Sequence, residues 1–77
     1  MTPKPPPDEQ AAWLRRLDKA ADARARADRV MEELIADARA AGVPLMAIAR
    51  HVPYSREWAR RIADRIDAER KAAAPDA

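Results

Sequence analysis

The chain has 77 residues, of which 48% are hydrophobic and 36% are charged, with a formal net charge of +2 and no cysteine. This length fits one small domain, and a domain of this size is marginal enough for a partner chain to complete its core. The lack of cysteine excludes disulfides and thiolate metal sites. No apolar run reaches the roughly 18 residues of a membrane span. Residues 1–10 lack the apolar stretch of a signal peptide, so a cytoplasmic protein is expected.

The basic surplus lies in the second half of the chain. Residues 1–42 carry eight Lys or Arg and eight Asp or Glu, whereas residues 43–71 carry seven basic and four acidic residues. Most of these basic residues are arginines, which suit phosphate and base contacts better than lysines do. The position of the basic surplus is therefore more informative than the net charge of the chain. A surplus of this size favours a nucleic-acid partner only weakly.

The first half predicts an arm followed by a long helix. Residues 1–8 are predicted to be a disordered arm, because four prolines and no apolar cluster occur there. Residues 9–41 contain no Gly or Pro and are rich in strong helix formers, so one long helix is predicted. Large apolar residues are missing over residues 20–26, so a break there is the alternative. Gly42 can take a positive φ and suits the position after the helix.

A short helix is predicted over residues 45–52. Pro44 can occupy the first turn of a helix, where its missing N–H costs nothing. Pro53 disfavours helical geometry at the residue before it, so the helix must end there.

A third helix is predicted over residues 55–71. Ser55 is the candidate N-cap, and Glu57 falls in the first turn, where the helix dipole favours acidic charge. Residues 72–77 are predicted to be a disordered tail. No run of alternating apolar and β-branched residues is present, so the expected fold class is all-α.

Apolar residues recur at helical spacing on both shorter segments. They are Leu45, Ile48, Ala49 and Val52 on the first and Ala59, Ile62, Ala63 and Ile66 on the second. These stripes can face each other and meet a stripe on the long helix, made of Val30, Leu34, Ile35 and Ala38. A short helix joined to a longer one by a turn of about three or four residues is helix-turn-helix geometry. The expected architecture is therefore a long N-terminal helix followed by a helix-turn-helix, a trihelical core.

Residues 45–66, LMAIARHVPYSREWARRIADRI, resemble the helix-turn-helix of small bacterial and phage DNA-binding regulators, which often read I-A-R-x-L-G-V-S-R-x-x-V-R-R-I. The matching positions are Ile48, Ala49, Arg50, Val52, Ser55, Arg56, Arg60, Arg61 and Ile62. Residues 35–44, IADARAAGVP, resemble the lead-in helix and turn, so the resemblance covers about half of the chain. The family often has glycine in the turn where this chain has Pro53. Because proline fixes φ near −65°, the turn is expected to differ in detail.

The resemblance implies that the third helix enters the major groove of double-stranded DNA with its N-terminal half. Arginine can bind guanine bidentately and glutamate can accept from cytosine, which implies base contacts by Arg56, Glu57, Arg60 and Arg61. Phosphate contacts, which make binding salt-sensitive, are implied for Arg50, Tyr54, Ser55 and Arg65.

Two other interpretations of the third helix stay open. Its outer face can be simply solvated, with Arg60 and Arg61 paired to Glu57 and Asp64. The indole of Trp58 can cover the apolar stripe or stack on the sugar–phosphate edge of DNA.

The long helix carries a heptad pattern. Residues follow a 4, 3, 4, 3 spacing at Trp13, Leu17, Ala20, Arg24, Ala27, Met31, Leu34, Ala38 and Ala41. One helix cannot bury Trp13, Leu14 and Leu17 by itself, so dimerisation through these residues is the favoured interpretation. Folding them back onto the core is the alternative, and it needs the break. A two-fold dimer would set two recognition helices about one DNA turn, roughly 34 Å, apart.

The expected function is sequence-specific DNA binding by a homodimeric transcriptional regulator of phage or plasmid type. The alternatives are a protein-binding adaptor that docks its long helix on a larger machine such as RNA polymerase, and a DNA recombination or packaging accessory factor. One His, one Gly and no Cys provide no catalytic group, metal site or phosphate loop. No cofactor, small-molecule substrate or membrane association is expected.

Overall fold

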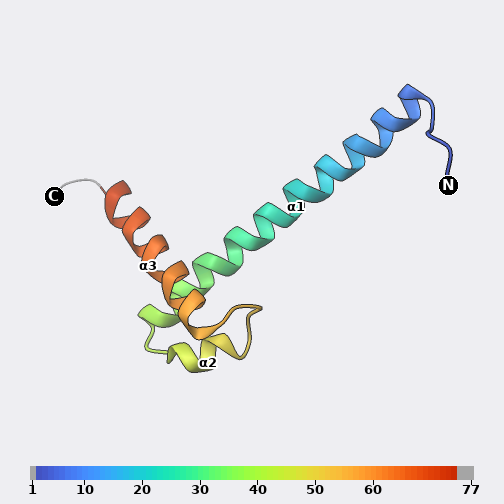
Figure 1. The fold of residues 1–77 in the computed structure, drawn as a ribbon. Helices are drawn as coiled ribbons and strands as arrows, with labels where there is room; N and C mark the ends of the chain where they lie inside the picture. Colours follow the sequence, from blue (N-terminus) through green and yellow to red (C-terminus); the bar gives the residue numbers. More distant parts are fainter. Residues whose placement is uncertain (1, 75–77) are drawn as a thin grey trace.

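The computed structural model describes residues 2–74 of the chain. All regular structure in these residues is helical, which confirms the all-α class, and the helices are α1 (Pro7–Ala40), α2 (Leu45–Ala49) and α3 (Arg56–Ala73). α3 crosses the C-terminal end of α1, α2 packs beside this crossing, and the N-terminal half of α1 projects away from both (Figure 1). The molecule is consequently elongated, with extents of 55 × 35 × 15 Å.

α1 is one continuous helix of 34 residues. It begins at Pro7, two residues before the predicted start, because proline fits the first turn and two acidic residues follow at the positive end of the dipole. The predicted arm over residues 1–8 is therefore too long, and Met1 lies outside the described residues. The structure does not adopt the alternative break over residues 20–26, since alanine and arginine sustain a helix without large apolar side chains.

Gly42 ends α1 with a φ of 96°, and no other residue in the range 2–74 has a positive φ. The Gly42 N–H donates to the Arg39 carbonyl at 2.9 Å, and the Val43 N–H donates to the Ala38 carbonyl at 3.0 Å. This pair of bonds is a Schellman motif, in which a left-handed residue satisfies the last carbonyls of the helix. The helix thus ends at Ala40, one residue before the predicted end.

α2 has five residues and is shorter than the predicted helix over 45–52. The Arg50 N–H donates to the Ala47 carbonyl at 3.2 Å, and the His51 N–H donates to the Ile48 carbonyl at 3.0 Å. These i to i+3 bonds tighten the last turn, and Pro53 has no N–H with which to extend it. The connection to α3 therefore spans residues 50–55 and is longer than the three or four residues expected.

α3 has 18 residues and a capped start. The Ser55 Oγ accepts a hydrogen bond from the Trp58 N–H at 3.1 Å, which satisfies one of the free donors of the first turn. The helix continues to Ala73, two residues beyond the predicted end, because alanines sustain it. The predicted tail over residues 72–77 is therefore too long, and its residues 75–77 lie outside the described part of the chain.

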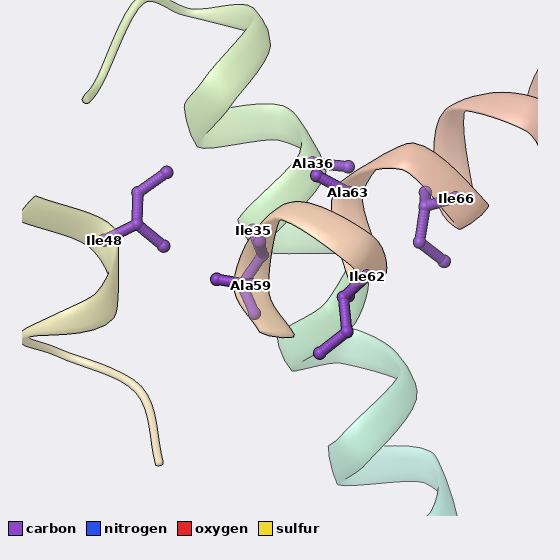
Figure 2. Close-up of a cluster of buried hydrophobic side chains, with 7 residues drawn as sticks. All are labelled: Ile35, Ala36, Ile48, Ala59, Ile62, Ala63 and Ile66. Carbon is purple, nitrogen blue, oxygen red and sulfur yellow. The ribbon is translucent and has the colours of Figure 1, made fainter. Parts of the chain in front are cut away.

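The core lies where the three helices meet (Figure 2). Its buried side chains are Ile35, Ala36, Ile48, Ala59, Ile62, Ala63 and Ile66. The predicted stripe on α3 is thus confirmed in full. Three of the buried residues are alanines, and small side chains at a helix crossing reduce the distance between the two axes.

The predicted stripe on α1 is partly wrong. Ile35 is buried as expected, but Val30 and Leu34 are 57% and 60% exposed. At 100° per residue, Ile35 and Ala36 face α3, whereas Val30 and Leu34 lie on the adjoining side of the same helix. α3 does not cover this side, so these residues line an open groove instead.

Substitution of Ile66 by alanine tests the position of the core. Because its side chain is fully buried, Ile66→Ala is expected to lower the free energy of unfolding by about 2–5 kcal/mol. Met46 is 58% exposed, so Met46→Ala is the matched control and is expected to stay within about 0.5 kcal/mol of the unaltered protein. Urea denaturation followed by circular dichroism measures both. Equal losses in the two variants would contradict the core described above.

Candidate nucleic-acid interface

The first two turns of α3 present a charged outer face to solvent. The buried stripe turns one side of the helix toward α1 and α2, so the opposite side is left uncovered. All four residues expected to contact bases are exposed on these turns, and they are Arg56, Glu57, Arg60 and Arg61. The structure thus brings them together on one short surface.

Two of these arginines pair with carboxylates on the same helix. Arg60 Nη2 lies 2.6 Å from a Glu57 oxygen, and Arg60 Nη1 lies 2.9 Å from an Asp64 oxygen. Arg61 Nε lies 3.3 Å from the same Glu57 oxygen. These are the pairs of the solvated-face interpretation. Surface pairs of this kind are weak.

The hydrogen bond from Arg60 lowers the pKa of Glu57 from 4.5 to about 2, and Arg61 contributes to the same shift. Glu57 is therefore ionised at neutral pH, and an ionised carboxylate only accepts hydrogen bonds. On a DNA surface it would repel phosphates, and it could accept from the amino group of cytosine.

Of the four residues expected to contact phosphates, Arg65 and Tyr54 have contacts within the protein. Arg65 pairs with Glu32 of α1 at 2.8 Å and with Glu69 at 3.0 Å, and the hydrogen bonds that it donates to these carboxylates raise its pKa. It therefore ties α3 to α1. Tyr54 is half-buried against the core.

Arg50 and Ser55 lie at the two ends of the connection, and both are exposed. The Ser55 hydroxyl caps α3, which leaves its own hydrogen free to be donated. In the described part of the chain, neither Arg50 nor Arg56 forms an ion pair. Trp58 is 51% exposed, so it does not cover the core stripe fully and presents apolar surface beside these charges.

Arg39 joins α1 to α3 in a way that the sequence pattern does not predict. It reaches from α1 to Asp64 and Asp67 of α3, at 2.6 Å in each case, and the hydrogen bonds that it donates to these carboxylates raise its pKa. The partners are 25 and 28 positions away in the chain, so no local pattern could reveal the pairing.

The three residues expected at a dimer interface lie on the projecting half of α1. Trp13, Leu14 and Leu17 are 53%, 58% and 61% exposed. The Arg16 guanidinium lies 4.5 Å from the centre of the Trp13 ring, which is cation–π geometry. Because α1 has no break, these side chains cannot fold back onto the core of their own chain.

Comparisons of the chain with protein-family models, with curated proteins and with solved structures find no match. Within residues 2–74, no helix has both the length and the apolar character needed to cross a membrane. The same residues contain no group of three His, Cys, Asp or Glu side chains that could hold a metal ion.

The pairing of Glu57 is directly measurable. Arg60→Ala removes the largest cause of the shift, so the pKa of Glu57 is expected to rise from about 2 toward 4.5. The folded-state pKa lies below the unfolded one, so the pairing stabilises the fold above pH 4.5, and this contribution is lost as the pH falls from 4.5 toward 2. Carboxyl-detected NMR titration gives the pKa, and Arg56→Ala is the control expected to leave it unchanged. A Glu57 pKa near 4.5 in the unaltered protein would show that the pair does not form in solution.

Proposed function

We propose that the chain binds double-stranded DNA, with α2 and α3 acting as a helix-turn-helix and α3 entering the major groove. One observation carries the proposal. The first two turns of α3 hold Arg56, Arg60 and Arg61 on an uncovered face, while the opposite side of the helix is packed against α1 and α2 through Ala59, Ile62, Ala63 and Ile66. A rigid helix with arginines near its N-terminus matches the width and the hydrogen-bond pattern of the major groove.

The charge around this face supports the proposal. Arg50 in the connection and Arg56 in the first turn have no carboxylate partner among the described residues. Unpaired arginines in the turn before a recognition helix are placed for phosphate contacts, which give affinity and position the helix. On binding DNA, Arg60 and Arg61 would release the Glu57 carboxylate and form hydrogen bonds to the edges of the bases instead.

The proposal includes a homodimer that regulates transcription. Two copies related by a two-fold axis would present two α3 helices to one duplex and would read a palindromic site. The exposed Trp13, Leu14 and Leu17 supply apolar surface of the kind that a partner chain covers.

The same exposed residues favour a second candidate function. A protein-binding adaptor would dock the projecting half of α1 on a larger protein and would use the trihelical end only as support. The arginine face of α3 would then have no binding role, so the two functions make opposite predictions for DNA.

The first measurement is a polarisation titration of the protein on labelled genomic DNA fragments at several salt concentrations. Affinity is expected to fall steeply with added salt, because phosphate contacts release counterions. The double variant Arg60→Ala, Arg61→Ala is expected to weaken binding to the preferred fragment by about ten-fold or more, because it removes two potential bidentate contacts.

The matched control is the double variant Arg15→Ala, Arg26→Ala, which removes the same charge from the projecting half of α1. It is expected to leave affinity for the preferred fragment largely unchanged. Binding that is insensitive to salt, or equal losses in the two double variants, would contradict recognition by α3. Failure to bind any fragment, together with retention of a protein partner through Trp13, Leu14 and Leu17, would select the adaptor.

A further inference from the structure

An apolar groove runs along α1 beside α2. Its volume is about 610 Å³, and its α1 wall extends from Ala27 to Ala38. The opposite wall is made of Val43, Ala47, Ile48, His51 and Val52. Val30 and Leu34 lie in this groove and are more than half exposed. Residues 2–74 thus bury seven side chains but leave these large aliphatic side chains uncovered.

The projecting half of α1 has the length of this groove. The stretch from Ala27 to Ala38 has twelve residues, and so does the stretch from Trp13 to Arg24. Each stretch is roughly 17 Å long at 1.5 Å per residue. The projecting stretch cannot reach the groove of its own chain, because α1 is a single continuous helix. A second copy can place it there.

The sizes of the side chains select the orientation. In a parallel pair each position of the heptad seam meets itself, so Arg24 would face Arg24, and Ala20 would face Ala20 and leave a void. In an antiparallel pair Trp13 and Met31 each meet an alanine, and the two leucines meet each other. The pairs across the interface are then Trp13 with Ala38, Leu17 with Leu34, Ala20 with Met31, and Arg24 with Ala27.

The charges select the same orientation. Residues 14–26 carry five basic and two acidic residues, whereas residues 27–40 carry two basic and four acidic residues. An antiparallel pair sets the basic stretch of one helix against the acidic stretch of the other, while a parallel pair sets like against like. The helix dipoles also oppose one another favourably in the antiparallel pair.

We propose that the groove binds the projecting half of α1 from a second copy of this chain, antiparallel, so that each copy fills the groove of the other. The Trp13 ring then lies at the end of the groove lined by Ala38 and Val43, and Leu17 lies against Leu34. This exchange buries the exposed residues of both halves of α1 at once.

The exchange also sets the distance between the two α3 helices. The two-fold axis passes between residues 25 and 26 of α1, and α3 packs on Ile35 and Ala36, about ten positions away. At 1.5 Å per residue this is roughly 15 Å on each side of the axis, or about 30 Å in all. That is close to the roughly 34 Å of one DNA turn. This consequence rests on the proposed DNA-binding function, whereas the pairing itself does not.

Engineered cysteines test the pairing, since the sequence has no cysteine of its own. Leu17→Cys and Leu34→Cys are prepared as separate variants and are oxidised alone and as a mixture. The mixture is expected to give a disulfide-linked dimer of twice the 8.6 kDa chain mass, and each variant alone is expected to give none. Within one chain the two positions are roughly 25 Å apart along the helix, too far to be bridged.

A self-linked Leu17→Cys variant would show a parallel dimer and would overturn the proposal. A chain mass of 8.6 kDa in sedimentation at tens of micromolar, with no cross-link in the mixture, would overturn it as well. Leu17→Asp is expected to give a monomer that keeps its helix content, since Leu17 makes no contact with the core. Ala25→Asp, on the outward side of α1, is the charge-matched control and is expected to stay dimeric.

The two proposals fail separately. If the mixture cross-links but no DNA fragment binds, the antiparallel pairing stands and the DNA-binding function falls. If DNA binds through Arg60 and Arg61 while the mixture does not cross-link, the function stands and the pairing falls.

Discussion

The contact between α3 and the C-terminal third of α1 is the constraint on which the rest of this structure depends. Ile62, Ala63 and Ile66 pack on Ile35 and Ala36, and Ile48 of α2 closes the same cluster. Because the contact uses one side of α3, the opposite side faces solvent over the whole helix. Because it uses only one end of α1, the other half of that helix projects without a partner (Figure 1). Both candidate surfaces are therefore direct consequences of one small core.

The two ends of α3 differ in charge and in ion pairing. α1 and α3 are joined by five ion pairs, which link Arg29 to Glu69, Arg39 to Asp64 and Asp67, Glu32 to Arg65, and Asp37 to Arg70. They engage the C-terminal part of α3, where residues 62–71 hold three acidic and three basic residues. Residues 50–61 hold four arginines and one glutamate. The surplus of positive charge thus lies in the connection and in the first turns of α3, on the uncovered face.

Periodicity and local signals were sufficient to predict the class, the three helices, the Gly42 end of α1, the Ser55 cap and the buried stripe of α3. These features depend on neighbours within four or five positions in the chain. The length of α2 and the face that α1 turns toward α3 depend on distant packing. The periodicity of α1 alone therefore predicts Val30 and Leu34 in the core, although both are exposed. The residues expected to contact bases lie on one helix, so the sequence is sufficient to predict that they share a surface. The pairing of Arg65 with Glu32 depends on how α3 crosses α1, which the sequence pattern does not predict.

The proposed antiparallel dimer would give the projecting half of α1 a partner for its exposed apolar side chains. Trp13, Leu14 and Leu17 of this half present apolar surface to water, and removing such surface from water is favourable by about 25 cal/mol per Å². The proposed antiparallel second copy would cover this surface with residues already in the chain, and it would hold two α3 helices at a fixed spacing. In the proposed function such rigid spacing would raise the affinity for DNA, because the second α3 would bind at a high effective concentration once the first had docked. In this arrangement the stability of α1 and the affinity for a two-part site depend on the same helix pair.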